Sequence, residues 1–155
     1  MTVSPTASLV RLGITLPSPA TPLAAYVPVR VSPDTAWVSG QGPTRDGISL
    51  YTGRLGADLT ISQGADAARL AAINVLAALA GALGSLERVR EFQRVAVMVA
   101  STPEFTDHPA VANGASDLFI EVFGEAGRHA RVAFGVAALP AGWAVEVEAQ
   151  VALAP

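Results

Sequence analysis

Two residue types are missing from this chain of 155 residues, which contains no cysteine and no lysine. Without cysteine the chain can form no disulfide, no thiolate metal site and no cysteine nucleophile. Its ten basic residues are all arginines, scattered along the sequence, and thirteen acidic residues leave a formal charge of -3. Nucleic-acid surfaces usually carry a basic patch, so this pattern argues against a nucleic-acid partner. His108 and His129 are the only histidines, and we therefore expect no histidine-rich metal site.

Charge is also scarce, because 15% of the residues are charged and 51% are hydrophobic, with a mean hydropathy of +0.43. Such a composition predicts that other copies of the chain cover part of the apolar surface. The first residues lack the basic start of a secretory signal. The most apolar segment, residues 68–84, contains Arg69 and Asn74, and we expect it to be too short and too polar to span a membrane. These features predict one cytoplasmic domain over residues 1–155.

The order of helical and extended patterns predicts an α+β fold. Residues 1–22 indicate a short helix or turn followed by a proline-rich arm, and residues 24–42 indicate two strands around a turn. A short third strand is expected at 48–51, a helix at 63–82 with Ser62 as its cap and Gly84 as its stop, and a buried strand at 94–101. A second helix opens at Thr106 or Asp107. Two last strands, at 130–139 and 144–153, are predicted to form a hairpin around residues 140–142, which gives β-β-(β)-α-β-α-β-β and one mixed sheet with two helices on one face.

The last two strands carry charge in an otherwise apolar setting. Side chains alternate between the faces of a strand, so the bulky residues of the first strand predict its core face (Ala130, Val132, Phe134 and Val136). Arg131 then stands on the opposite face with Ala133, Gly135 and Ala137. In the second strand, the predicted core residues are Val145, Val147, Ala149 and Val151. A hairpin would place Glu146 and Glu148 on the same side of the sheet as Arg131, with Arg131 opposite Glu148, Gln150 or Ala152.

Two interpretations of this face remain open from the residues. One is a solvated sheet surface with a cross-strand pair between Arg131 and Glu148. The other is a recess with a floor of small residues, in which Arg131 holds the carboxylate of a small acid with two hydrogen bonds.

Several motifs, in order along nearly the whole chain, resemble the Rid (YjgF-like) family of reactive intermediate imine deaminases. They are WVSGQGP at 37–43, the alanine-rich helix that ends at Gly84, Asn113 in PAVANGASDLF, HARVAFGVAALP at 129–140, and VEVEA at 145–149. The resemblance implies a chorismate-mutase-like fold and a homotrimer with three sites at subunit interfaces. It also implies cofactor-free hydrolysis of 2-aminoacrylate and related enamine or imine acids to 2-keto acids and ammonia.

The resemblance also implies roles for single residues. Arg131 matches the arginine that grips the substrate carboxylate, and Glu146 matches the glutamate that positions or activates a water. Tyr26, Ser39, Gly40 and Asn113 fall where the family lines its pocket. The chain departs from the family at His129, where many members have proline, and at Val132. It also has Ala133 where several members have a cysteine, so backbone groups near Gly40 and Ala133 are expected to hold the substrate nitrogen.

Structural explanations for these residues stand beside the functional ones. Tyr26 could be an edge-strand aromatic, Ser39 and Gly40 a bulge, Asn113 a local hydrogen-bonding residue, and His129 an exposed loop residue. Two other functions also remain open: a non-catalytic module that binds a small carboxylate, and a ribonuclease or translation inhibitor.

The hairpin register makes a further prediction about the active site. A strand rises about 3.3 Å per residue, which would separate Arg131 from Glu146 by roughly 13 Å or more. The two residues are therefore predicted to act from different subunits, or Glu146 to act through water, with Glu148 as the alternative carboxylate.

Overall fold

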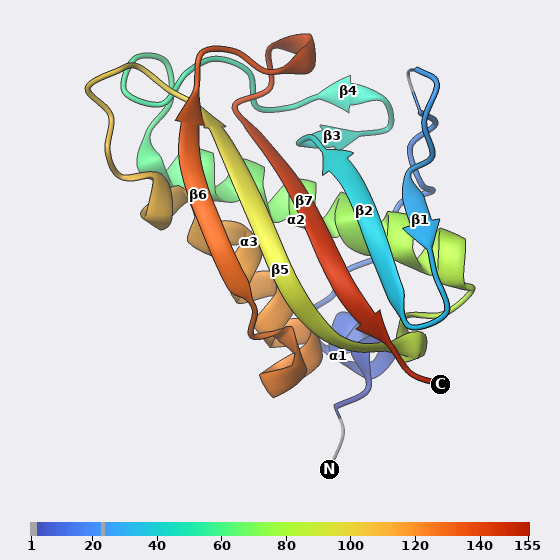
Figure 1. The fold of residues 1–155 in the computed structure, drawn as a ribbon. Helices are drawn as coiled ribbons and strands as arrows, with labels where there is room; N and C mark the ends of the chain where they lie inside the picture. Colours follow the sequence, from blue (N-terminus) through green and yellow to red (C-terminus); the bar gives the residue numbers. More distant parts are fainter. Residues whose placement is uncertain (1–2, 23) are drawn as a thin grey trace.

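The computed structural model describes residues 3–22 and 24–155, which form one five-stranded mixed sheet with helices packed on one of its faces (Figure 1). The helices are α1 (Pro5–Arg11), α2 (Ile61–Leu83) and α3 (His108–Phe123). The strands are β1 (Val29–Val31), β2 (Thr35–Gln41), β3 (Thr44–Arg45), β4 (Ile48–Ser49), β5 (Val89–Ala100), β6 (Ala130–Val136) and β7 (Val145–Leu153). Three short 3₁₀ turns complete the chain: η1 (Leu86–Arg88), η2 (Gly124–Gly127) and η3 (Pro140–Gly142).

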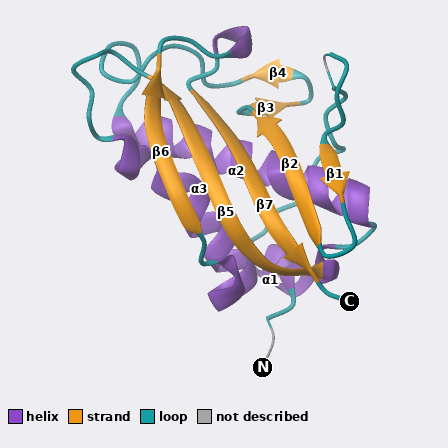
Figure 2. Cartoon of the chain, viewed as in Figure 1, coloured by secondary structure: helices purple, strands orange, loops and turns teal. Residues whose placement is uncertain are grey.

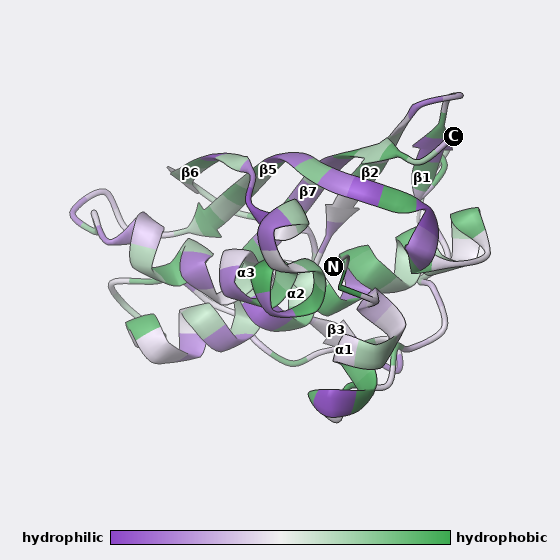
Figure 3. Ribbon diagram, turned by 90° about the horizontal axis from the view of Figure 1, so that it is seen from below, coloured by the Kyte–Doolittle hydropathy of each residue, from purple (hydrophilic) through white to green (hydrophobic). Residues whose placement is uncertain are grey.

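The sheet has the strand order β1-β2-β7-β5-β6, and its view from below separates two layers (Figure 3). Helices α2 and α3 pack beneath the sheet, and the apolar side chains of β2, β5 and β7 that point toward them form the core. No helix or strand of residues 3–22 and 24–155 covers the opposite face, called the outer face below. The predicted α+β architecture with two helices on one face is confirmed, and α1 is added at the edge of the helical layer (Figure 2).

Helix α2 is the central element of the core. By length and composition this helix could cross a membrane. However, 67% of its most apolar 18 residues are buried inside the fold, as expected for the core helix of a globular domain. Its start lies two residues earlier than predicted, because Thr60 rather than Ser62 is the cap. The Thr60 hydroxyl accepts from the Gln63 backbone while the Gln63 side chain accepts from the Thr60 backbone, a reciprocal pair that stabilises a helix start. Gly84 ends the helix in the left-handed region, as predicted.

The predicted third strand exists but does not join the main sheet. β3 and β4 form a separate two-stranded ribbon, joined by Asp46 and Gly47. Both residues have a positive φ, of 51° and 77°, which is the geometry that a two-residue hairpin turn requires.

The predicted hairpin between the last two strands is wrong. β6 pairs with β5 in the parallel sense, whereas β7 pairs with β5 and β2 in the antiparallel sense, so β5 lies between them. The connection passes around the end of β5, where the Ala100 backbone N–H donates to Ala144 and that of Ser101 to Val136. Residues 95–100 of β5 are mostly buried, and a buried strand needs a hydrogen-bonding neighbour along each of its two edges. The β5-α3-β6 crossover supplies one neighbour, and β7 supplies the other.

The predicted faces are correct for β7 and reversed for β6. Val145, Val147 and Val151 are fully buried against the helices. In β6, Val132 and Phe134 lie on the outer face and are 39% and 41% exposed, while Arg131, Ala133 and Gly135 face the helical layer. β6 is an edge strand, and α3 runs so close beneath it that only small side chains or a long polar one fit. A Cβ atom on Gly135, for example, would lie 2.7 Å from His108 Nε2.

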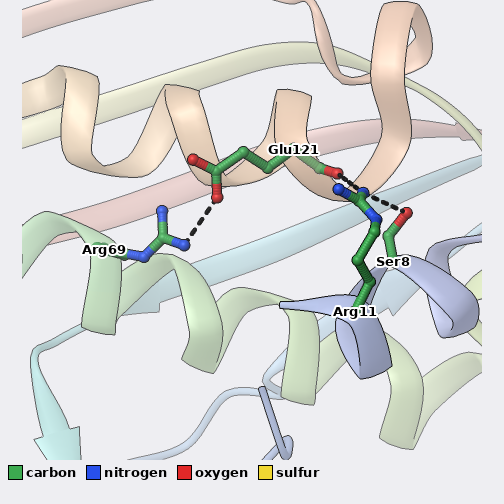
Figure 4. A network of polar contacts seen from close by, with 4 residues as sticks. All are labelled: Ser8, Arg11, Arg69 and Glu121. Atoms are coloured by element: carbon green, nitrogen blue, oxygen red, sulfur yellow. Dashed lines mark hydrogen bonds and ion pairs between the residues drawn. The ribbon is translucent and has the colours of Figure 1, made fainter. Parts of the chain in front are cut away.

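The N-terminal helix is fastened to the helical layer by a polar network (Figure 4). The Arg11 guanidinium donates to the backbone carbonyl of Glu121 at 3.2 Å and to the Ser8 hydroxyl at 3.4 Å. The Glu121 carboxylate pairs with Arg69 of α2 at 2.7 Å. Glu121 of α3 thus links α1 to α2. The predicted helix and arm over residues 1–22 are confirmed for residues 3–22, and residues 1–2 lie outside the described part.

Candidate functional site

Arg131 is held at the edge of the sheet by side chains of α3. Its Nη1 donates to Asn113 Oδ1 at 2.8 Å and to Ser116 Oγ at 3.1 Å. Asn113 and Ser116 are three residues apart on one helix, so both side chains face the same strand. Within the described residues, Nη2 and Nε of Arg131 make no hydrogen bond, and the side chain is exposed. One edge of a fixed guanidinium is therefore free for an anionic ligand.

His129 belongs to the same cluster, and its interpretation as an exposed loop residue is wrong. Its Nε2 lies 2.9 Å from Ser116 Oγ, and its Nδ1 lies 2.6 Å from the carbonyl oxygen of Gly127. The ring packs edge-on against Phe119 and tilted against Phe92. Burial lowers the pKa of His129 below its ordinary value, and the neighbouring Arg131 lowers it further against the opposing effect of the Gly127 carbonyl.

Glu146 lies on the outer face of β7, directly over Gly40 of β2. A Cβ atom on residue 40 would collide with the Glu146 carboxylate, so any larger residue there would displace this side chain. The side chain is half-buried, and this desolvation raises the pKa of Glu146, with the neighbouring charge of Glu148 as a smaller cause. Glu146 is thus a carboxylate whose proton affinity is shifted toward neutral pH.

Tyr26, Ser39 and Gly40 gather at the β1-β2 end of the sheet. The Ser39 hydroxyl donates to the Val27 carbonyl at 2.7 Å, which gives it a structural partner at an irregularity of the β2-β7 pairing. Tyr26 is 49% exposed, and together with Gly40 it lines a cavity of about 560 Å³. Trp143 and the proline-rich arm form other walls of this cavity, which Arg131 does not reach.

The predicted site residues therefore form two separate half-sites in one chain. The first contains Arg131, Asn113 and Ala133 at β6 and α3, and the second contains Glu146 with the residues near Tyr26. Arg131 is aligned through Val95 with Ala149 of β7, which places it two strands and three residues from Glu146. Strand spacings of about 4.8 Å and rises of about 3.3 Å put the two Cα atoms roughly 14 Å apart. Their side chains also point to opposite faces, which corrects the prediction that they share one.

Glu148 does not replace Glu146 as the partner of Arg131. Its carboxylate pairs with Arg94 Nη1 at 3.0 Å on the outer face, so the predicted cross-strand pair with Arg131 is wrong. The shared face of Arg131 and Glu146 and the Arg131–Glu148 pair were both predicted from a hairpin. In the structure β5 separates β6 from β7, and Arg131 points to the opposite face from the one that the hairpin would give it.

The described residues contain no cluster of side chains that is arranged to bind a metal ion. Within residues 3–22 and 24–155, no three His, Asp or Glu side chains lie close enough together to hold a metal ion. His108 instead bonds through Nε2 to Ser101 Oγ at 3.1 Å, and His129 bonds to Ser116.

Ser116 is the site residue that the sequence did not reveal. It is 8% exposed and connects Arg131 to His129. The available signal was its spacing from Asn113, since positions i and i+3 share a helix face. Its bond to His129 requires β6 to lie parallel to β5 above α3. The hairpin interpretation places β6 elsewhere and therefore could not predict this bond.

Known proteins resemble this chain over almost its whole length. A family model described as "YjgF/chorismate_mutase-like, putative endoribonuclease" matches residues 6–147. Protein TCP17 of Trypanosoma cruzi is 51% identical over 148 residues, which cover 95% of this chain and 92% of that protein. The structure of Atu1372 from Agrobacterium tumefaciens, of unknown function, is 41% identical with a TM-score of 0.90, covering 97% of this chain and 92% of that one. A "putative endoribonuclease" from Shewanella oneidensis is 37% identical with a TM-score of 0.93, covering 97% and 99%.

Proposed function

The chain belongs to the YjgF/chorismate-mutase-like family, and on that premise we propose that it is a cofactor-free cytoplasmic hydrolase of small enamine and imine acids. Its substrates are of the 2-aminoacrylate type, and its products are 2-keto acids and ammonia. The observation that carries this proposal is the state of Arg131, whose Nη1 is fixed by Asn113 and Ser116 while its other edge is open. A planar guanidinium held in this way matches a carboxylate with two parallel hydrogen bonds.

The chemistry needs one water and one group that moves protons. The enamine first takes a proton at its terminal carbon and loses one from its nitrogen, which gives the isomeric imine with an electrophilic central carbon. Water adds to that carbon, and the resulting carbinolamine expels ammonia to leave the keto acid. Glu146 accepts a proton from the attacking water and returns it to the departing nitrogen, a role that suits a carboxylate whose pKa is raised. Backbone groups near Gly40 and Ala133 orient the substrate nitrogen.

The two half-sites come together between copies of the chain in this proposal. One chain supplies Arg131 with Asn113, and its neighbour supplies Glu146 with the residues near Tyr26. A closed homotrimer repeats this contact three times. The proposal is supported by the roughly 14 Å separation within one chain and by the apolar side chains that the outer face leaves exposed, among them Trp37 and Phe134.

The test is release of ammonia and keto acid from an imine that an amino-acid oxidase generates in situ. We expect the protein to accelerate release above the uncatalysed rate and Arg131→Ala to abolish the acceleration. Arg90→Ala is the matched control, because Arg90 is exposed and paired with Glu91 at 3.2 Å. No acceleration by a folded protein that still binds pyruvate would instead identify a non-catalytic carboxylate-binding module.

A second candidate function is RNA cleavage, because both the matched family and the Shewanella relative are described as a "putative endoribonuclease". Four of the ten arginines are paired with glutamates, which leaves fewer cations for a phosphate backbone. We expect no RNA cleavage above background. Cleavage that survives Arg131→Ala but fails at raised salt would support this candidate over imine hydrolysis.

A further inference from the structure

The arginine of the proposed site is connected to a partly buried histidine through one hydroxyl. We propose that Ser116 and His129 are positioning residues, with neutral His129 orienting the Ser116 hydroxyl so that it holds the guanidinium of Arg131 in place. His129 reaches Arg131 through Ser116, so it is not a catalytic residue. The use of that guanidinium for a carboxylate rests on the proposed function, while the positioning itself does not.

The hydrogen-bond partners assign the protons in this chain of residues. The carbonyl of Gly127 can only accept, so His129 Nδ1, 2.6 Å away, carries the ring proton. The Nε2 of the neutral ring then has a lone pair and accepts the proton of Ser116 Oγ at 2.9 Å. The Ser116 oxygen in turn presents its own lone pairs to Arg131 Nη1 at 3.1 Å. The Gly127 carbonyl at one end can only accept and the Arg131 guanidinium at the other can only donate, and with a neutral ring between them this fixes the direction of every bond.

The surroundings of His129 favour the neutral ring that this arrangement needs. Phe92 of β5 and Phe119 of α3 pack against the imidazole and carry no charge. Arg131 of β6 is the charged group that faces it. Glu125 and Arg128 of the adjoining η2 turn pair with each other at 2.9 Å and are largely exposed. Burial is the largest effect that opposes protonation of His129, and the Arg131 charge adds a smaller one against the favourable hydrogen bond to the Gly127 carbonyl.

Protonation of His129 would reverse one bond of the path. Nε2 would become a donor to Ser116, whose oxygen would then accept from two cations, and its own proton would have to find another acceptor. The imidazolium would also repel Arg131 at short range. We therefore expect acid to loosen the guanidinium. By linkage, neutralising or removing the Arg131 charge must raise the proton affinity of His129.

The first experiment measures this coupling without any assay of activity. NMR titration of the two imidazole signals gives the pKa of His129, with His108 as an internal control on the same chain. Arg131→Ala should raise the pKa of His129 and leave that of His108 unchanged. Pyruvate should raise the pKa of His129 in the native protein and not in Arg131→Ala. A His129 pKa that Arg131→Ala does not move would overturn the inference.

The second experiment uses the reaction of the proposed function and separates KM from kcat. Ser116→Ala should raise KM by about tenfold or more, the effect of one lost charge-assisted hydrogen bond, with kcat within about twofold. His129→Gln retains an acceptor for Ser116 but cannot titrate, so its KM should stay level as the pH falls below the ordinary histidine value of 6.5, where the native KM rises. Combining Ser116→Ala with His129→Gln should add nothing to Ser116→Ala alone, because both act through one bond.

The outcomes distinguish the two proposals. An unchanged KM in folded Ser116→Ala, or a KM of His129→Gln that still rises in acid, would contradict the positioning role. A protein that neither hydrolyses imines nor binds pyruvate would contradict the proposed function, and the Arg131→Ala titration would still decide whether His129 and Arg131 are coupled. His129→Phe, which loses the acceptor but retains an aromatic ring, should raise KM at every pH.

Discussion

At the scale of single residues, Glu146 is an ionisable side chain that is half-buried. Its replacement should change the reaction rate and the folding stability in opposite directions. Glu146→Gln should lower kcat by about 10²–10⁴-fold, the usual contribution of a general base. The native kcat should also fall on the acid side at a pH above the ordinary glutamate value of 4.5, because burial raises the pKa of Glu146. Rate measurements across pH check both points, and a variant with native kcat would exclude Glu146 from catalysis.

Although Glu146→Gln should lower kcat, we expect it to maintain or raise the stability of the protein at neutral pH. The raised pKa means that the folded state disfavours the ionised carboxylate, so folding stability falls as the pH rises through this pKa. Gln carries no charge, and Glu146→Gln should therefore melt at the same temperature as the native protein or higher at neutral pH. This advantage should vanish below about pH 4.5, where the native side chain is protonated in both states. A lower melting temperature at neutral pH would contradict the burial argument.

Val147 is the adjacent residue on the opposite face of β7, and it tests the assignment of the two faces. It is fully buried among core side chains. Val147→Asp should destabilise the protein by more than about 3 kcal/mol, since the new charge would have no partner. Glu148→Gln is the control on the outer face and should cost little. Denaturant unfolding of both variants measures the difference, and equal stabilities would show that the faces are assigned wrongly.

How far the sequence predicts the site differs from residue to residue. Arg131 and Asn113 were expected in one pocket, and the structure joins them by a hydrogen bond. The interpretation of His129 as an exposed loop residue is wrong, because its ring is partly buried and bonded to Ser116. Its partners Phe92, Ser116 and Phe119 come from two other elements, and a strand pattern alone contains no information about which elements pack against it.

At the scale of elements, the crossing of α2 and α3 depends on Gly114. A Cβ atom at this position would collide with the backbone carbonyl of Ala65. Gly114→Ala gains about 1 kcal/mol of helix propensity, but backbone cannot move aside as a side chain can, and overpacking costs about 1–3 kcal/mol. We expect a net loss of stability in thermal or denaturant unfolding.

The control for this prediction is the same change at Gly81, on α2. Its Cβ atom would meet Pro19 Cγ of the N-terminal arm at 2.6 Å, and the arm can shift more easily than a packed helix. Gly81→Ala should therefore be neutral or slightly stabilising. If Gly114→Ala were as stable as Gly81→Ala, the two helices would not be in close contact at Gly114.

Most elements follow from local patterns, whereas the position of the last two strands does not. Helix α2 is capped at its start by Thr60 and Gln63 and at its end by Gly84. The turn between β3 and β4 is formed by Asp46 and Gly47. All of these interactions lie within a few residues of one another in the sequence. The choice between a hairpin and a split pair depends on β5, which lies 30 or more residues earlier. Trp143 donates to Ser49 at 3.0 Å and helps to hold the β6-β7 connection against the β3-β4 ribbon, a long-range contact that periodicity does not encode.

At the scale of the whole molecule, the outer face of the sheet exposes apolar side chains. Trp37 is 52% exposed, and Val132 and Phe134 lie on the same face. A monomer rarely leaves a large apolar patch uncovered. We expect the native protein to sediment as a trimer at micromolar concentration and Phe134→Asp to sediment as smaller species. Ile48→Asp, at an exposed position on the separate β3-β4 ribbon, is the control and should remain trimeric. A native monomer would contradict a site shared between copies.

The most direct measurement of the central claim mixes two inactive proteins. Arg131→Ala lacks the carboxylate-binding group, and Glu146→Ala lacks the proton acceptor, so each alone should be inactive. If each site takes Arg131 from one chain and Glu146 from its neighbour, random reassembly of equal amounts into cyclic trimers restores about one quarter of the sites. Imine hydrolysis should then recover to about a quarter of the native rate. No recovery in mixed trimers verified by mass would contradict the account, because it would place both groups of a working site in the same chain.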